Sequence, residues 1–420
     1  LLMSGINMYL MALVLRAVLG WNWDVSMWVS AITIAVYVGL GGLLSAIFTE
    51  VIQFFLIWFG LFLIPLLGIL DVGGFGQILS DVPKNMLALW STTANPANNP
   101  MGVHWLGLVV GLGWVLSFGY WTADFLVIQT AFSAKDLNAA RMTPIVASFF
   151  KMALPFIIVL SGLIAYNLIN SGQLTLLTEN GQPSYDSALP LLITRYFPSG
   201  LIGLGVTALL AGFMAGQAGN IVAFNTVWTY DLYLLLRKKK PSDLHLVWVG
   251  RVTTIVGILL SVVIAYWARQ FPTIMDFIQA IFSWVNAPLF ATLLLGMFWR
   301  RTTPTGAFWG LLCGMLTSFL LFLGMRTDIL NNFLHIITFS YDPSDMSKNL
   351  WQAAWGWGVC FIVTVVISLF TKPKADEELV GLVKGLTEES KLEKPPLYKK
   401  PELWAFVSLV VLVILNIYFW

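Results

Sequence analysis

Six ionisable side chains lie within or beside long apolar segments, where a charged group is costly and needs an explanation. They are Glu50, Asp124, Lys151, Asp231, Arg251 and Asp276. A carboxylate in such surroundings can take up a proton or a cation, so Glu50 and Asp124 are candidates for ion coupling. Lys151, about two turns into its helix, must reach a polar surface, pair with an acid or face a wet cavity. Arg251 lies near a segment end, and we expect it to extend to the membrane surface.

One apolar stretch, residues 106–131, is unusually rich in glycine and polar side chains. Two interpretations are open: an unwound helix that lines a cavity, or a helix whose glycines let a neighbouring helix approach closely. The residues concerned are Gly111, Gly113, Gly119, Tyr120, Thr122 and Asp124.

The elements that must position these side chains are membrane-spanning helices. Hydrophobic residues make up 58% of the 420 residues, and charged residues only 10%, against roughly 25% in an ordinary soluble domain. A bilayer accommodates such a composition, and about 20 apolar residues span it as a helix. The net charge of +2 gives no reason to expect nucleic-acid binding. The sequence shows no phosphate loop, catalytic triad pattern or metal-ligand spacing, so we expect neither an enzyme nor a certain metal site.

About eleven segments qualify as such helices. The block 188–236 is too long for one crossing, so we expect a short outer helix before Pro198 and then one spanning helix. Residue 1 already lies inside an apolar helix, and we therefore expect further residues upstream. The segments lie near 1–19, 25–43, 45–70, 104–131, 142–170, 188–236, 245–269, 274–299, 305–325, 350–371 and 403–420.

Lysine and arginine predict the orientation of these helices through the positive-inside rule. With the loop after residue 131 inside, the polar segment 372–402 is also inside, and the C-terminal Trp420 falls outside. This segment adds seven positive residues, and its apolar positions from Leu379 to Leu386 predict a short amphipathic helix on the inner surface. A solvated connector is the alternative. The other inside residues are Lys135, Arg141, Arg237, Lys238, Lys239, Lys240, Arg300 and Arg301.

Four motifs occur in the order and spacing of one transporter family. YVGLGGLLSAIFTEVIQ (37–53) is similar to a GGLxAVxxTDxxQ signature, and GYWTADFLVIQTAFSAKDLNAAR (119–141) to a YWxTDQxIxQRxLAAK stretch. NTVWTYDLY (225–233) is similar to STxFTMDIY, and LLLGMFWRRTTPTGAFWG (293–310) to a helix end followed by a GAFWG loop. Through these motifs the chain resembles the sodium/solute symporter family, which includes the sodium/glucose cotransporters.

The resemblance implies an all-α polytopic membrane protein with the inverted-repeat fold of the leucine transporter. In that fold two five-helix repeats surround a mid-membrane site, and the first helix of each repeat is broken. Segment 104–131 would be the broken helix of the second repeat, while the family's first helices would be absent. The implied layout is the remainder of the first repeat (1–70), an external loop (71–103), the second repeat (104–300), peripheral helices (301–371), a cytoplasmic connector (372–402) and a C-terminal transmembrane helix (403–420).

The resemblance also implies a set of solute-binding residues. Tyr120 matches the aromatic that closes the family's sugar site from the inside, and Ser117 a polar sugar-contacting position. Lys151 matches the substrate-site lysine, and Gln279 a glutamine that hydrogen-bonds the sugar. Neutral donors and acceptors beside an aromatic ring suit a hydroxyl-rich solute. Glu50 retains a carboxylate at a second ion position.

The sequence departs from the family at the main sodium site. Two adjacent hydroxyl residues of the family align with Ala215 and Gly216, which offer no side-chain oxygen, although sodium needs oxygen ligands as other hard cations do. This degenerate site makes sodium coupling doubtful, and Gln217 and Asn220 are the polar members of a small-residue face. The arginine of the family's QR pair is replaced by Thr130.

Two hypotheses follow from these residues. The first is a secondary transporter that moves a small polar solute, with sugars or polyols favoured, by alternating access in a bacterial inner membrane. Sodium, protons or no ion would drive it, and Na⁺ is the one ligand expected besides solute and lipid. The second is a non-transporting structural subunit with protein partners in a larger membrane complex. Uptake of solute by the full-length protein distinguishes them.

Overall fold

The structure, a computed structural model, describes residues 1–88, 90–95, 98–99, 101–179, 181–237, 241–271, 273–327, 329–386 and 400–418, without the side chains of 40–47, 130 and 132. Lys238, Lys239, Lys240, Trp420 and residues 387–399 of the predicted connector therefore lie outside the described residues, as does the side chain of Thr130. The chain divides into two compact units. Unit 1 comprises Leu1–Pro83 and Ala147–Ile274, and unit 2 comprises Lys84–Val146 and Met275–Trp420.

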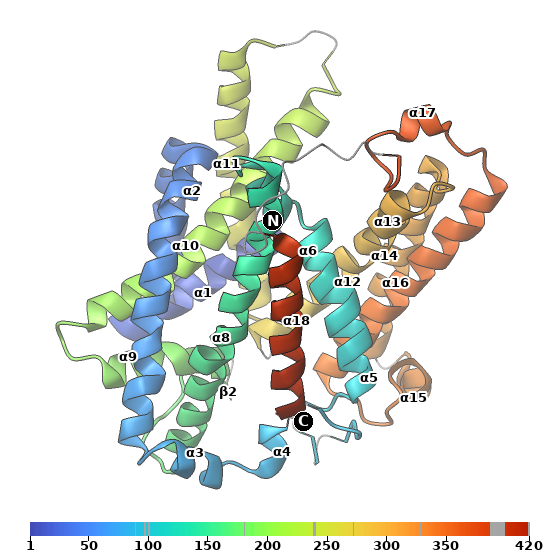
Figure 1. The fold of residues 1–420 in the computed structure, drawn as a ribbon. Helices are drawn as coiled ribbons and strands as arrows, with labels where there is room; N and C mark the ends of the chain where they lie inside the picture. Colours follow the sequence, from blue (N-terminus) through green and yellow to red (C-terminus); the bar gives the residue numbers. More distant parts are fainter. Residues whose placement is uncertain are drawn as a thin grey trace. The chain divides into compact units, whose positions relative to one another are not determined.

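Unit 1 is helical apart from one short hairpin (Figure 1). It contains α1 (Leu2–Leu19), α2 (Trp23–Asp71), α3 (Phe75–Asp81), most of α8 (Leu137–Asn170), the antiparallel strands β1 (Thr178–Glu179) and β2 (Gln182–Pro183), the 3₁₀-helix η2 (Tyr185–Ser187), α9 (Ala188–Tyr196), α10 (Ile202–Thr226), the π-helix η3 (Val227–Tyr233) and α11 (Asp243–Ala268).

Unit 2 has helices joined by loops and contains no strand among its described residues. It contains α4 (Lys84–Leu87), α5 (Trp105–Gly107), the π-helix η1 (Leu108–Phe118), α6 (Gly119–Ala123), α7 (Phe125–Phe132), the start of α8, α12 (Ile274–Trp284), α13 (Asn286–Phe298), α14 (Pro304–Arg326), the 3₁₀-helix η4 (Asn331–Phe333), α15 (Leu334–Thr338), α16 (Asp345–Phe370), α17 (Asp376–Leu379) and α18 (Pro401–Tyr418).

The described residues include ten helices that are long and apolar enough to cross a membrane, with Trp23–Gly39 as a shorter apolar stretch. The predicted polytopic helical membrane protein is thereby confirmed. The prediction for block 188–236 is also confirmed, because α9 ends at Tyr196, ahead of Pro198, and α10 with η3 forms one long span.

The predicted helices over 25–43 and 45–70 both fall within α2. Within it, Phe48–Asp71 is long and apolar enough to cross a membrane, and Trp23–Gly39 is the shorter apolar stretch. The 49 residues of α2 correspond to about 74 Å of α-helix, more than twice the roughly 30 Å of a hydrocarbon core, so this one element holds both predicted apolar segments.

Unit 1 packs around α1, which contacts α2, α10 and α11, and α2 also packs along α10. Between α1 and α11, Ser261 Oγ donates a buried hydrogen bond to Ser4 Oγ at 2.7 Å. In unit 2, α14 and α16 form the most extensive helix–helix contact, and α13 packs against both of them. Helix α14 starts where the sequence supplies a cap and a proline: Gly306 N–H donates to Thr303 Oγ1 at 3.1 Å, and Pro304 follows the cap.

The predicted amphipathic helix in the inner connector is reduced to one turn, α17. Leu379 and Val383 are buried, while Val380 and Leu382 are exposed. After α17 the backbone turns, and Lys384 N–H donates to the Met297 carbonyl oxygen in the last turn of α13 at 2.9 Å. This bond gives a partner to a carbonyl that the end of α13 leaves without an intrahelical hydrogen bond.

Candidate functional site

Tyr120 and Gln279, two of the predicted solute-binding residues, border the same region of unit 2. The Tyr120 ring stacks on Phe282 with centroids 5.6 Å apart and planes at 28°, and Phe282 follows Gln279 by three residues on α12. Gln279 is 7% exposed, and its Nε2 donates to Met275 Sδ at 3.6 Å. Its Oε1 is buried and has no hydrogen-bond partner among the described residues. A buried acceptor without a partner is costly, so this oxygen is available to a hydroxyl donor.

The stretch around Ser117 is helical throughout, so the unwound helix expected at the glycines is wrong. Ser117 is exposed on η1, which joins α6 without a break. A Cβ on Gly111 would lie 2.6 Å from the Leu350 carbonyl oxygen, and one on Gly119 would lie 3.2 Å from Phe290 Cβ. The close-packing interpretation therefore holds for these two glycines. The π-helical hydrogen bonding of η1 is itself uncommon and occurs often at functional sites.

The helix breaks of unit 2 lie at Asp124 and Val285 instead. Asp124 has extended backbone (φ −75°, ψ 117°) between α6 and α7, and its Oδ1 accepts a hydrogen bond from Leu126 N–H at 2.9 Å. It thus caps the N-terminus of α7. The side chain of Asn286, the first residue of α13, interacts with Asp124. The break at Val285 was missed, although Pro288, three residues later, was a signal for it.

Lys151 and Glu50 belong to unit 1. Lys151 is exposed on α8, and its neighbour Phe150 packs on Phe54 and Trp58 with ring centroids 4.9 and 5.5 Å apart. Glu50 is half-buried on α2, and no ion pair joins it to another described residue. The two units are defined separately, so the grouping of Lys151 with Tyr120, Gln279 and Ser117 stays a prediction.

The degenerate sodium position on α10 lies against the Asn7 side chain of α1. A Cβ on Gly216 would lie 2.8 Å from Asn7 Nδ2 on α1. The Gly216 carbonyl oxygen accepts a hydrogen bond from Asn220 Nδ2 at 2.8 Å. Gln217 is fully buried, and neither of its amide atoms has a hydrogen-bond partner among the described residues. Neither Ala215 nor Gly216 supplies a side-chain oxygen here.

An ion cluster at one end of unit 1 escaped prediction. Glu179, on β1, lies 2.5 Å from Arg16 Nη1 and 3.8 Å from Arg269 Nε. The Arg269 guanidinium also lies over the Trp23 ring, 5.0 Å from its centroid. The cluster joins the ends of α1 and α11 to the hairpin. The three charged residues are far apart in the sequence, so no local sequence pattern predicts that they form a cluster.

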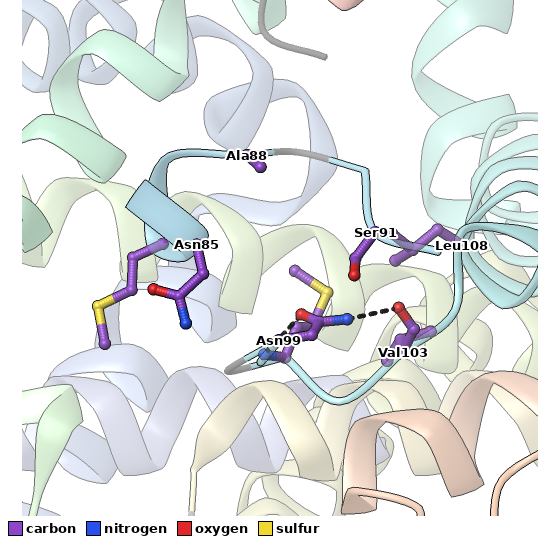
Figure 2. A pocket seen from close by; sticks show the side chains of 8 residues that line it. Asn85, Ala88, Ser91, Asn99, Val103 and Leu108 are labelled. Atoms are coloured by element: carbon purple, nitrogen blue, oxygen red, sulfur yellow. Dashed lines mark hydrogen bonds between the residues drawn. The ribbon is translucent and has the colours of Figure 1, made fainter. Parts of the chain in front are cut away.

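Two cavities occur in the described residues, and none of the predicted solute residues lines either of them. The smaller, about 160 Å³, belongs to unit 2 and lies beside the start of η1. Figure 2 shows Asn99 in its wall, where Nδ2 donates to the Val103 carbonyl oxygen at 2.8 Å. The larger, about 280 Å³, belongs to unit 1 and contains Asp71 and Asp81. Hydrogen bonds from Asn167 and then Gln77 lower the pKa of Asp81.

A family model for the sodium:solute symporter family matches residues 3–314. The chain belongs to the sodium:solute symporter family. Three relatives within it are sodium/glucose cotransporter 1 of Oryctolagus cuniculus (25% identical over 404 residues, 88% of this chain and 60% of the relative), the sodium/myo-inositol cotransporter of Homo sapiens (26% over 423 residues, 89% and 56%) and the sodium/glucose cotransporter of Vibrio parahaemolyticus (28% over 345 residues, 79% and 63%). The chain thus spans about 60% of the length of these symporters.

The symporter fold is also found among solved structures. A Na⁺-coupled sialic acid symporter, in its substrate-bound outward-open state, matches with a TM-score of 0.67 at 20% identity, over 89% of this chain and 72% of the other. At this identity the likeness supports the fold alone, and it agrees with the inverted-repeat architecture expected from the motifs. The named family members are transporters, and enzyme chemistry is not indicated for this chain.

Proposed function

We propose that this protein is a secondary transporter that moves a small, neutral, hydroxyl-rich solute across a membrane by alternating access. The observation that carries the proposal is the buried Gln279 Oε1, which has no hydrogen-bond partner within the described part of the chain, on the helix whose Phe282 stacks on Tyr120. An amide acceptor beside an aromatic surface suits a sugar or polyol. The names of the glucose and myo-inositol cotransporters support the same solute class.

We propose sodium as the driving ion, because the relatives are named as sodium cotransporters. Our doubt about sodium, which rested on Ala215 and Gly216, receives no support from these relatives. The ion would have to be held by oxygens other than the side chains of those two residues. Glu50 and Asp124 are the proposed candidates for ion coupling, and Glu50 forms no ion pair with another described residue.

A non-transporting structural subunit remains the alternative, but no observation among the described residues favours it. A bacterial inner membrane is the proposed location, since the Vibrio parahaemolyticus relative shows that bacteria contain such symporters. Lys151 is proposed as a further solute contact through the family resemblance.

Uptake into proteoliposomes tests the proposal. The full-length protein is reconstituted and offered labelled glucose, mannose and myo-inositol, with and without an inward sodium gradient. We expect saturable uptake of at least one solute, stimulated by sodium. Gln279→Ala should raise KM for that solute roughly tenfold, the equivalent of about 1.4 kcal/mol and within the range for a hydrogen bond to a buried group. Asn416→Ala, on the almost fully exposed helix α18, is the matched control.

Folded protein that takes up none of the three solutes would contradict the solute class. Uptake that is the same with and without sodium would support the inference that the site at Ala215 and Gly216 binds no sodium. The protein would then be a uniporter or a proton-driven carrier.

A further inference from the structure

Helix α12 is held by α16 at two points that bracket Gln279. Asn349 Nδ2 donates to the Asp276 carbonyl oxygen at 3.0 Å. Gln352 Nε2 donates to Ser283 Oγ through a short hydrogen bond. Both donors are fully buried, and all four residues belong to unit 2. Asp276 lies three residues before Gln279 and Ser283 four residues after it, so the two anchors are one turn to either side.

The anchors are themselves fixed. Asn349 Oδ1 accepts a hydrogen bond from Arg326 Nη2 of α14 at 2.9 Å, so both ends of this carboxamide are in use. Ser283 Oγ donates to the Ala280 carbonyl oxygen at 2.6 Å. A Cβ on Gly356 of α16 would lie 1.9 Å from Ser318 Oγ of α14, so these two helices lie in close contact. The two hydrogen bonds from Asn349 and Gln352, which we call the polar clamp on α12, are therefore made by a helix that is closely packed on α14.

The rotation of α12 decides where Gln279 points. Successive residues turn by about 100° around an α-helix, so Asp276 and Ser283 share one face to within about 20°. Gln279 lies about 60° from Asp276, and Phe282 lies a further 60° or so in the same direction. The side of Phe282 is the one that meets Tyr120. Gln279 thus lies on the flank between the face that α16 holds and the face that meets the aromatic stack.

We propose that Asn349 and Gln352 are positioning residues that set the rotation of α12 and so aim the Gln279 carboxamide at solute hydroxyls. This inference rests on the proposed function for its consequence in transport. Apolar packing between membrane helices leaves rotation weakly specified, whereas a hydrogen bond is directional. Two such bonds, one turn before and one turn after Gln279, oppose both rotation and tilt. Each donor is fully buried, so losing the bond leaves a buried polar group unpaired.

The first test measures uptake of the best-transported solute of the glucose, mannose and myo-inositol panel. Gln352→Leu keeps the volume but removes the donor to Ser283, and KM should rise roughly fivefold, the equivalent of about one hydrogen bond. Vmax per folded protein should stay within about twofold of the wild type if only aim is lost. Thr364→Val, at a buried hydroxyl that lies against Gly310 of α14, is the matched control and should leave KM unchanged.

A double-mutant comparison separates positioning from general loosening of the fold. In a Gln279→Ala background, Gln352→Leu should raise KM no further, because the carboxamide that Gln352 orients is absent. An equal rise in both backgrounds, or a fall in Vmax and folded yield with KM unchanged, would overturn the inference.

A second test needs no solute, so it decides the inference even if no panel solute is transported. In protein with Cys313 and Cys360 replaced by alanine, Gln279→Cys is labelled with a small water-soluble methanethiosulfonate. Gln352→Leu should change the labelling rate several-fold, the effect of a buried side chain turned toward or away from water, and Thr364→Val should not. Identical rates in all three proteins would refute the positioning role, whereas absent transport with altered rates would refute only the proposed function.

Discussion

The contact between α14 and α16 predicts an unusually large effect for one methyl group. Gly306, Gly310 and Gly314 follow one another at four-residue spacing along α14, on the face toward α16. A Cβ on Gly310 would lie 1.9 Å from Thr364 Oγ1 and 2.8 Å from the Cys360 carbonyl oxygen. The hydroxyl can rotate away, but the carbonyl belongs to the backbone of α16. Gly310→Ala must therefore push the two helices apart.

The expected loss follows from two opposing terms. Overpacking of this kind costs about 1–3 kcal/mol, and the upper part of that range applies because backbone must move. Replacing a helical glycine by alanine returns about 1 kcal/mol. We expect a net loss of about 2 kcal/mol in the free energy of unfolding. Gly358→Ala on α16, where an added Cβ meets no atom within 4 Å, is the matched control and should gain stability.

Unfolding in mixed micelles of dodecyl sulfate and a mild detergent, followed by tryptophan fluorescence, measures both variants. The difference between them should be about 3 kcal/mol, which is the steric cost alone, because both variants share the propensity gain of about 1 kcal/mol. Adding Thr364→Ala to Gly310→Ala should restore only part of the loss, because the Cys360 carbonyl remains. Equal stability of Gly310→Ala and Gly358→Ala would refute the close approach of α14 to α16.

Three further predictions use the same unfolding assay. Glu179→Gln should cost about 2 kcal/mol, below the roughly 3–5 kcal/mol of a fully buried pair because its arginine partners are partly exposed, whereas Lys374→Ala in an exposed pair should cost under about 0.5 kcal/mol. Hydrogen bonding lowers the pKa of Asp81 in the folded protein. The contribution of Asp81 to the free energy of unfolding is therefore present above the unfolded pKa near 3.8 and is lost as the pH falls through the folded pKa. Asn167→Ala should thus destabilise at pH 7, and this effect should shrink progressively as the pH falls below 3.8. Gln217→Met, which removes two buried amide atoms that have no hydrogen-bond partner in the described part of the chain, should raise stability by about 1–2 kcal/mol in sodium-free buffer.

The spans could be predicted from the sequence because lipid is the dominant solvent for these helices. Apolar length alone locates Pro304–Arg326 to within one residue of the predicted 305–325 at each end. The same signal cannot locate the interruptions inside a span. The break at Val285 and the π-helical stretch Leu108–Phe118 lie within continuous apolar sequence, where hydropathy does not change when the hydrogen-bond pattern does.

The polar clamp on α12 illustrates what sequence could not supply. Asn349 and Gln352 stand at the edge of an apolar segment, which is where polar residues ordinarily meet water or headgroups. Their burial follows from which helix lies beside α16, and that is a property of the fold. Gln279, by contrast, was predicted through its motif, and the structure adds that its acceptor is unpartnered among the described residues.

On α10, sodium coordination and packing against the Asn7 side chain concern the same position. A hydroxyl at position 216 would need a Cβ 2.8 Å from Asn7 Nδ2, so the glycine that removes the family's ligand also leaves room for this side chain of α1. The Gly216 carbonyl is already engaged by Asn220. The next oxygen along the helix is Gln217 Oε1, buried and unpartnered among the described residues, and a carboxamide oxygen is a suitable ligand for a hard cation. If sodium stimulates uptake by the wild type and this stimulation is lost in Gln217→Met, the ion binds one residue along α10 from the family's position. If uptake by the variant stays sodium-dependent, Gln217 is not the ligand, and Glu50 is the next residue to test.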